Sequence, residues 1–254
     1  MIKTILPILL LIVSTYDPMI TEINGAVIND INKKETHMNV PVLHINSEEF
    51  TPLESLFFKN AVGGKDIEQE TLVSLKFSVE FLEIKFECRD NPRMDQNYYT
   101  ENNTPLFHQE VFEIFIHEGA ESSENYLELQ INPNNAIFLA RISNRYKTDH
   151  TFELELLDAE LPNIEHDVFK DPEHQLWKGY LKIPLQLIGN RVEDAGNVYR
   201  MNIYRIISEE DHEDPQWTCD AKNATFACWS STMTEEPQFH VPERFGYLYF
   251  NKPD

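Results

Sequence analysis

The sequence predicts an all-β protein, a β-sandwich of the immunoglobulin or jelly-roll type with about ten antiparallel strands and few short helical turns. Three observations carry this prediction. Short runs in which apolar and polar residues alternate recur from residue 71 onward, and a period of two is typical of half-buried strands. No stretch repeats apolar residues with the period of an amphipathic helix. Acidic, asparagine-rich or proline-bearing connections separate the runs, as turns do in sandwiches.

Length and composition favour one large domain with a substantial core. The chain has 254 residues, of which 41% are hydrophobic, and no shift in composition divides it. We therefore predict a single domain over residues 25–254. The formal net charge of −22 repels phosphate backbones and anionic membranes, which argues against nucleic acid as a partner. Neutral ligands are compatible with such a surface.

Residues 1–20 are predicted to be a signal peptide. Lys3 precedes an apolar run over residues 5–13 that is too short to span a membrane. Residues 14–15 and 25–26 both fit a cleavage point, so the end of the peptide stays open. The sequence thus favours an extracytoplasmic protein, periplasmic or secreted, whose mature chain does not insert into a membrane. The alternative is a cytoplasmic protein with an apolar N-terminal strand.

The first strands are expected at residues 40–45, 71–77 and 81–88. Pro41 marks the first as an edge strand, because proline cannot donate a ladder hydrogen bond. In the third, apolar residues alternate with charged ones over the whole run, which indicates one buried and one solvated face. The polar connection over residues 89–108 is long for a compact domain, and such connections are often functional.

The remaining strands follow the same pattern. They are expected at residues 110–117, 126–132, 136–142, 152–156, 177–184, 199–206, 226–230 and 246–250. Pro184 ends one of them, and Leu185 to Ile188 are expected to form a single helical turn. Pro242 and Gly246 bring a polar loop into the final aromatic strand, which we expect to close a sheet.

Four polar side chains stand on adjacent predicted strands, partly inside apolar runs: Glu110, Glu113, Glu128 and Gln130. A polar group that is buried needs a hydrogen-bond partner or a ligand. Glu110 and Glu113 are three positions apart on one strand, so they face opposite sides of the sheet. They therefore make a poor pair for glycoside hydrolysis, which needs both carboxyl groups at one bond.

Other chemical motifs are scarce. The chain has no nucleophile elbow, no phosphate-binding glycine loop and no zinc-type histidine spacing. Its three cysteines, Cys88, Cys219 and Cys228, are too few for a disulfide framework. Cys219 and Cys228 could bridge a local loop in an extracytoplasmic protein, and Cys88 could equally be buried at a strand end.

Aromatic residues next to the polar loops are more informative. A sugar site combines flat aromatic faces with amide, carboxyl and guanidinium groups that bond hydroxyls. Phe107 ends the long connection and directly precedes the strand of Glu113, while Phe239 begins the final loop. Each could also be an ordinary core residue, so the pair alone does not decide between a ligand platform and packing.

Several segments occur in an order that a known family also shows. They are Pro105–Ile116, Tyr126-Leu127-Glu128 with Asn132, Trp177 before Gly179 and Ile183-Pro184, Tyr199–Arg205, and His240-Val241-Pro242-Glu243-Arg244-Phe245-Gly246. Together they resemble carbohydrate-binding module family nine, a DOMON-like β-sandwich, and most of all its stand-alone bacterial members. The resemblance covers roughly residues 71–250.

This resemblance implies a site for the end of a polysaccharide. Family members sandwich a terminal sugar between two tryptophans, and the motifs place Phe107 and Phe239 at those positions. Glu113 matches a glutamate that bonds sugar hydroxyls, and Gln130 stands where the family has an arginine. The smaller rings and the missing charge predict weaker stacking and one weaker hydrogen bond. The predicted carbohydrate-binding residues are Phe107, Glu113, Gln130, Asn202, Arg205 and Phe239.

The resulting hypothesis is a non-catalytic protein that binds polysaccharide ends and is associated with glycan breakdown. No cofactor is expected, although the family resemblance implies that the acidic loops could hold structural calcium. One alternative is a glycoside hydrolase. A second is a haem-binding sandwich that uses Met201 or Met94 with His108 or His240. A third is a sandwich used for protein contacts whose sugar site has decayed.

Overall fold

The structure is a computed structural model that describes residues 39–145, 151–159, 163–189, 197–212 and 216–251. The description below concerns the unit from Val40 onward. The predicted signal peptide (residues 1–20) and the predicted domain start at residue 25 lie outside the described residues. In the part of the chain that is described, no helix is long and apolar enough to cross a bilayer.

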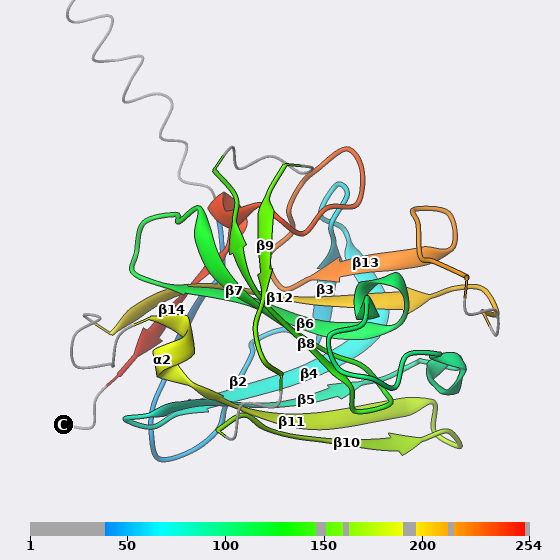
Figure 1. Cartoon of the computed structure of the whole chain (residues 1–254), viewed down its shortest axis with the longest axis horizontal. Coiled ribbons are helices and arrows are strands. Elements are labelled where there is room, and N and C mark those ends of the chain that lie inside the picture. The colour runs from blue at the N-terminus through cyan, green and yellow to red at the C-terminus, as the bar shows by residue number, and fades with distance from the viewer. Residues whose placement is uncertain (1–38, 146–150, 160–162, 190–196, 213–215, 252–254) are drawn as a thin grey trace, which may run out of the picture. The chain divides into compact units, whose positions relative to one another are not determined.

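The described chain is almost entirely β-structure, which confirms the predicted fold class (Figure 1). The strands are β1 (Val42–Ile45), β2 (Thr51–Pro52), β3 (Phe57–Asn60), β4 (Asp66–Phe77), β5 (Phe81–Cys88), β6 (Val111–Glu118), β7 (Asn125–Ile131), β8 (Ile137–Ser143), β9 (Glu153–Leu156), β10 (Glu165–Asp171), β11 (Leu176–Pro184), β12 (Val198–Ser208), β13 (Ala224–Cys228) and β14 (Gly246–Phe250). The helical turns are η1 (Met94–Gln96), η2 (Leu106–His108), α2 (Leu185–Ile188) and η3 (Pro242–Arg244).

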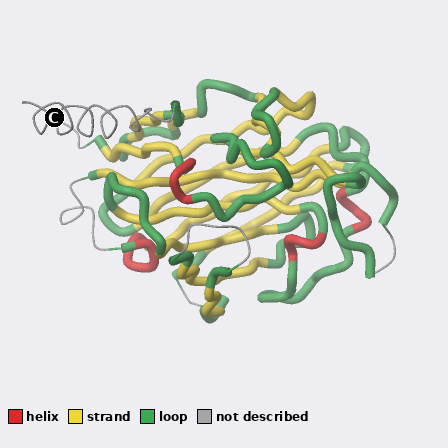
Figure 2. The backbone as a smooth tube through the Cα atoms, turned by 90° about the horizontal axis from the view of Figure 1, so that it is seen from above, coloured by secondary structure: helices red, strands yellow, loops and turns green. Residues whose placement is uncertain are grey.

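The strands form two layers that β4 joins. The second half of β4 pairs with β5, which continues to β11 and β10. The first half pairs with β3, and from there the order runs through β13, β12, β6, β7 and β8 to β9. A strand that passes from one layer to the other is typical of the corner of a sandwich. Figure 2 shows the strands running side by side, with the loops gathered at their ends.

The main apolar core lies between the two layers. Leu82, Ile84, Phe86 and Cys88 of β5 are at most 3% exposed, as the alternation of that run predicts. Phe86 stacks on Phe112 of the opposite layer, with ring centroids 4.0 Å apart. Each buried side chain of this kind stabilises the fold by about 1.5–3 kcal/mol. The core therefore fixes which face of β6 and β12 points inward.

Four details of the fold bear on the prediction. The described residues form fourteen strands rather than about ten, because short strands such as β2 and β3 carry no alternation of their own. β1 and β14 pair in parallel, whereas antiparallel strands were expected. The turn at Leu185–Ile188 forms as expected. Cys88, Cys219 and Cys228 are free thiols, so the bridge between the last two, left open by the sequence, is not formed.

Candidate functional site

A second apolar cluster lies on the outer face of the layer formed by β6, β7, β8 and β12. Side chains alternate along a strand, so Ile114 of β6 points into the main core while Phe115 belongs to the outer cluster. Glu113 shares the outer face with Phe115 by the same alternation. Phe239 and Phe245, from the segment around η3, pack onto this cluster. The outer face of the layer is thus covered by chain rather than open to solvent.

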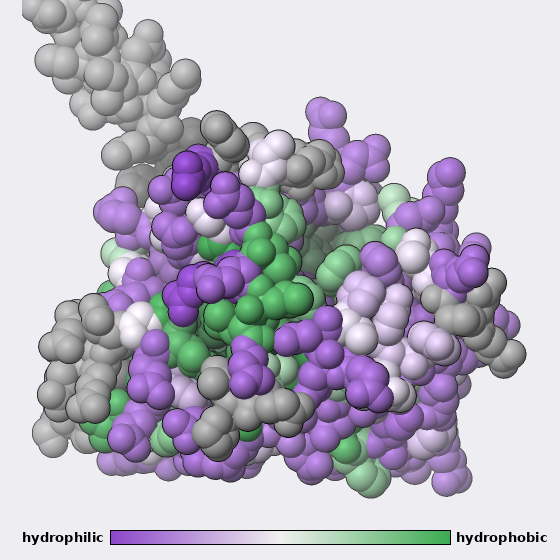
Figure 3. All heavy atoms as spheres, viewed as in Figure 1, coloured by the Kyte–Doolittle hydropathy of each residue, from purple (hydrophilic) through white to green (hydrophobic). Residues whose placement is uncertain are grey.

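This covered face holds a cavity of about 190 Å³. It is lined by Phe107, Glu113, Phe115, Glu128, Gln130, Phe152, Leu154, Ile206, Phe226, Pro237, Gln238, Phe239 and His240. Four of the predicted sugar-binding residues are among them. Figure 3 shows hydrophobic residues gathered on the molecular surface where Figure 1 places β9. Leu154 of β9 is 43% exposed and forms part of the cavity wall.

Three polar side chains of the cavity come from neighbouring positions on β6 and β7. Glu113 stands opposite Gln130 in the antiparallel pair, and Glu128 is two residues from Gln130 on the same face. Gln130 Nε2 donates a hydrogen bond of 2.5 Å to Glu128 Oε1. Glu113 Oε1, Glu128 Oε2 and Gln130 Oε1 are buried and have no hydrogen-bond partner within the described chain. Buried polar atoms are normally satisfied, so these atoms indicate a place for a ligand or water.

Burial raises the pKa of both carboxyl groups. The pKa of Glu113 lies well above its usual value because the group is fully desolvated and because Glu128 adds a like charge. The same burial raises the pKa of Glu128, and the hydrogen bond from Gln130 offsets part of the rise. None of the described residues that line the cavity is lysine or arginine. The pair therefore retains a proton near neutral pH and offers an O–H donor as well as acceptors.

The two predicted aromatic platforms differ in exposure. Phe107 on η2 is 37% exposed, and its ring meets Phe138 edge to face at 5.9 Å. Phe239 is 7% exposed, because Tyr204 stacks on one side of its ring at 4.2 Å. The Tyr204 hydroxyl also donates to the Phe239 carbonyl oxygen at 2.8 Å. Phe239 is therefore fixed to the sheet and lines the cavity from a rigid position, while Phe107 lines it from the surface.

The site contains residues that the sequence analysis did not assign to it. His240 lines the cavity, stacks on Phe152 at 3.9 Å and lies 2.8 Å through Nδ1 from the Tyr126 hydroxyl. Burial lowers the pKa of His240 to about 3, so the ring is neutral at physiological pH. The sequence does contain a sign of the role of Glu128, since this residue and Gln130 are polar positions inside an apolar run. It contains no such sign for Phe152, because the place of that residue depends on long-range packing.

Arg205, which the sequence analysis assigned to the sugar site, does not line this cavity. Tyr204 stands opposite Glu113, so Arg205 points the other way, into the main core. There it is fully buried, with its Nε 3.4 Å from Glu110 Oε1. It donates further hydrogen bonds to the carbonyl oxygens of Glu70 and Arg89. Arg205 is thus a structural tie between the two layers.

Asn202 shares the outer face with Tyr204 but does not line the cavity. Its Nδ2 donates to the Ser230 carbonyl oxygen at 2.8 Å, and its Oδ1 accepts from the Ser230 amide at 2.9 Å. Both ends of the amide are therefore used to hold the chain that leaves β13. Asn202 therefore lies on the predicted strand but outside this cavity.

The cavity suits a small, uncharged ligand that carries both hydroxyl groups and an apolar face. Its aromatic rings offer flat apolar surface, and the buried Glu113–Glu128–Gln130 group offers donors and acceptors. No group of three or more His, Cys, Asp or Glu side chains suited to a metal ion occurs among the described residues.

Comparison with known proteins gives a fold and a distant relative. No protein-family model matches the chain. A curated protein from Arthroderma benhamiae named "Extracellular protein" is 24% identical over 188 residues, which span 71% of this chain and 78% of that protein.

Solved structures resemble the chain at low sequence identity. A candidate carbohydrate-binding protein from Bacteroides uniformis superposes with a TM-score of 0.56 at 13% identity, covering 83% of this chain and 99% of that one. A carbohydrate-binding module of family 9 from Caldicellulosiruptor kristjanssonii, in complex with glucose, gives a TM-score of 0.50 at 12% identity over 84% of this chain and 96% of that one. Its complex with cellotriose gives 0.50 at 11% over 84% and 94%. These proteins share the fold of this chain.

Proposed function

We propose that this protein is a non-catalytic carbohydrate-binding protein that takes a terminal sugar ring of a polysaccharide into the cavity between Phe107 and Phe239. In this proposal the ring lies against the aromatic walls, and its hydroxyls bond to Glu113, Glu128 and Gln130. The observation that carries the proposal is the set of buried oxygens without partners on the floor of an aromatic-lined cavity. Sugar hydroxyls both donate and accept, which matches a carboxyl pair that holds one proton.

The size of the cavity favours one ring over a chain. About 190 Å³ corresponds to the volume of about six water molecules, and is below the range of about 300–1,000 Å³ typical of larger ligands. A site of this size fits the end of a polysaccharide, with the rest of the chain outside. The family 9 structures of similar fold hold glucose and cellotriose, which supports glucose-based chains as first probes.

We place this protein outside the cytoplasm, in association with glycan breakdown. The name of the Arthroderma benhamiae relative supports the location, as does the apolar N-terminal run of the sequence. A polysaccharide is too large to enter a cell intact, so a protein that binds its ends works where enzymes shorten it. Detection of the mature chain in the extracytoplasmic fraction, cleaved near its N-terminus, tests this part; an uncleaved cytoplasmic chain would contradict it.

The test is a calorimetric titration of the full chain with glucose, cellotriose and a panel of xylo-, manno- and galacto-oligosaccharides. At least one should bind, and Phe107→Ala should weaken it about two- to twelvefold, because an aromatic stacking contact is worth roughly 0.5–1.5 kcal/mol. Phe57→Ala is the matched control, since Phe57 is similarly exposed at 41% but lies on β3 away from the cavity. Equal loss in both variants, or no binding by any sugar, would overturn the site.

A glycoside hydrolase is the second candidate, because the structure brings Glu113 and Glu128 into one cavity. Two carboxyl groups at one site are what hydrolysis of a glycosidic bond requires. The distinction is direct: release of reducing ends from a bound oligosaccharide by purified protein, lost in Glu128→Gln, would establish the enzyme. Binding without any release after prolonged incubation would establish the non-catalytic role.

A further inference from the structure

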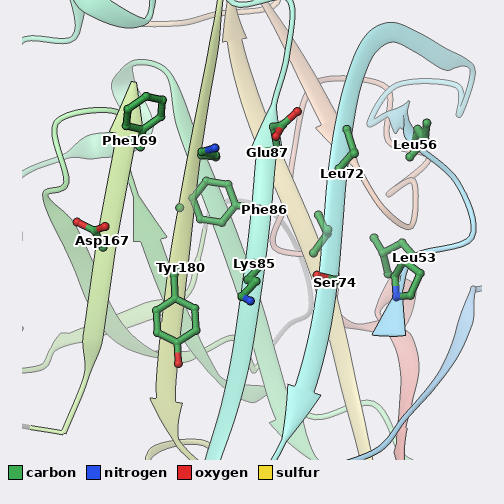
Figure 4. Close-up of a pocket in the computed structure, with 14 residues that line it drawn as sticks. Leu53, Leu56, Leu72, Ser74, Lys85, Phe86, Glu87, Asp167, Phe169 and Tyr180 are labelled. Atoms are coloured by element: carbon green, nitrogen blue, oxygen red, sulfur yellow. The ribbon is translucent and has the colours of Figure 1, made fainter. Parts of the chain in front are cut away.

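A second and larger cavity lies on the opposite side of the sandwich, on the outer face of β4, β5, β11 and β10. Its volume is about 480 Å³, within the range of about 300–1,000 Å³ typical of ligand pockets. Figure 4 shows Phe169 and Asp167 along one side and Leu53 and Leu56 along the other. No residue is shared with the candidate sugar site.

The walls of this cavity are mainly apolar. Leu53, Leu56 and Leu72 form one side and Phe169 the other, and Leu56 and Phe169 are 41% and 53% exposed. Large apolar side chains grouped around a hollow are an unfavourable surface in water. Burying them under the hydrocarbon part of a ligand is therefore favourable.

Two lysines give the cavity its chemical character. Lys85 Nζ lies 4.0 Å from the centre of the Phe50 ring, and Lys178 Nζ lies 5.1 Å from that of Phe169. Neither ammonium group forms an ion pair with a described residue, although the chain carries a formal charge of −22. On the same sheet face Lys76 is paired with Glu83, and Lys182 is paired with Glu165.

Glu87, a carboxylate in the wall of this cavity, forms no ion pair with either lysine. Glu87 stands opposite Lys178 in the strand pair, but its Oε1 accepts a 2.6 Å hydrogen bond from Arg89 Nε. Lys85 is two residues from Glu87 on the same face. The aromatic rings thus hold both ammonium groups beside the hollow while their N–H donors remain available. Asp167, on β10 next to the strand of Lys178, contributes a negative charge to the cavity wall.

We propose that this cavity binds an apolar monocarboxylate, with its carboxylate on Lys85 and Lys178 and its hydrocarbon body against Leu53, Leu56 and Leu72. The proposal is independent of carbohydrate binding at the other site. A neutral sugar suits this cavity less well, because leucine and phenylalanine side chains form much of its walls and two of its polar groups are ammonium groups without an ion pair among the described residues. A carboxylate joins both features, since charge-assisted hydrogen bonds and apolar burial then act on one molecule.

The test is a calorimetric titration of the full chain with octanoate at low ionic strength. Octanoate should bind, while 1-octanol, which lacks the charge, and glucuronate, which lacks the apolar body, should each bind at least about tenfold more weakly. Added salt should weaken octanoate binding, because the lysines are exposed. Equal binding of octanol, tighter binding of glucuronate, or no heat with octanoate would each overturn the proposal.

Variants separate this site from unspecific attraction. Lys85→Gln with Lys178→Gln should weaken octanoate about tenfold or more, whereas Lys65→Gln with Lys222→Gln should leave it unchanged. Lys65 and Lys222 are the matched controls, since they are exposed and likewise have no ion pair with a described residue. Asp167→Asn should strengthen octanoate binding a few-fold, because it removes the opposing charge. Equal effects of the two lysine pairs, or weaker binding by Asp167→Asn, would contradict the assignment.

Discussion

Glu110 and Glu113 are the same residue type, three positions apart, and 0% and 1% exposed, yet they belong to different kinds of site. Glu110 points into the core between the layers and meets Arg205, with Ser208 N donating to its second oxygen. Glu113 points to the outer face, where its nearest charged neighbour is another carboxyl group. One carboxyl group is satisfied by the fold, whereas the other is buried without a partner for Oε1 in the described chain.

The difference teaches how to separate structural from functional polar residues in this molecule. A buried charge that the fold needs has its own counter-charge. Removing either partner leaves the other buried without a counter-charge. A buried polar group that the fold does not satisfy lowers stability, and it persists where a ligand uses it. The substitutions below test this contrast, beginning with the largest expected effect.

Glu110→Leu should destabilise the protein by about 3–5 kcal/mol, because it leaves the guanidinium of Arg205 buried without its counter-charge. The measurement is urea unfolding at neutral pH. The double variant Glu110→Leu with Arg205→Met should recover most of the loss, since it replaces the whole pair by apolar groups. A single variant as stable as the wild type would show that the pair does not tie the layers.

Phe239→Ala and Phe107→Ala should differ in stability. Phe239 is buried against Tyr204, so its removal should cost about 3 kcal/mol or more. Phe107 is 37% exposed and should cost about 1 kcal/mol or less. Thermal and urea unfolding of both variants provide the comparison. Equal losses would mean that Phe107 is a core residue rather than a surface wall of the cavity.

The pH dependence of stability should reflect the raised pKa values of Glu113 and Glu128. A carboxyl group whose pKa is raised on folding holds its proton more tightly in the native state, so its contribution to the unfolding free energy falls as pH rises from about 4.5 through the raised pKa. Glu110, with a pKa raised by burial to about 7, acts with the same sign. Glu113→Leu should flatten this decline by at most about 1.4 kcal/mol per pH unit. An unchanged slope in the variant would contradict the raised pKa of Glu113.

The smallest effect is expected on the outer face of the other layer. Lys182 and Glu165 form an ion pair of 2.7 Å with side chains 25% and 60% exposed. Lys182→Gln should change the unfolding free energy by less than about 1 kcal/mol, because water screens exposed pairs. A larger loss of unfolding free energy in urea would contradict the expectation that exposed ion pairs stabilise this protein much less than the buried pair of Glu110 and Arg205.

Alternation along the chain predicted the sandwich well, because each half-buried strand carries its own pattern. The strands at residues 81–88 and 126–132 and the edge strand after Pro41 follow from local sequence. The short strands and the parallel pairing of β1 with β14 do not, since they depend on contacts far apart in the chain. Arg205 lies away from the cavity for a narrower reason. A shift of one residue moves a side chain to the other face, and only the register with Glu113 reveals that Tyr204, not Arg205, lies on the outer face with Glu113.

The most direct test of the central claim compares Glu113→Leu with the wild type in two measurements on the same protein: urea unfolding and titration with the tightest-binding oligosaccharide. We predict that the variant is as stable as the wild type or more stable by about 1 kcal/mol, because an unpaired buried polar group is removed, while sugar affinity falls at least about tenfold. A variant that is several kcal/mol less stable, or one that binds the sugar as tightly as the wild type, would contradict the account.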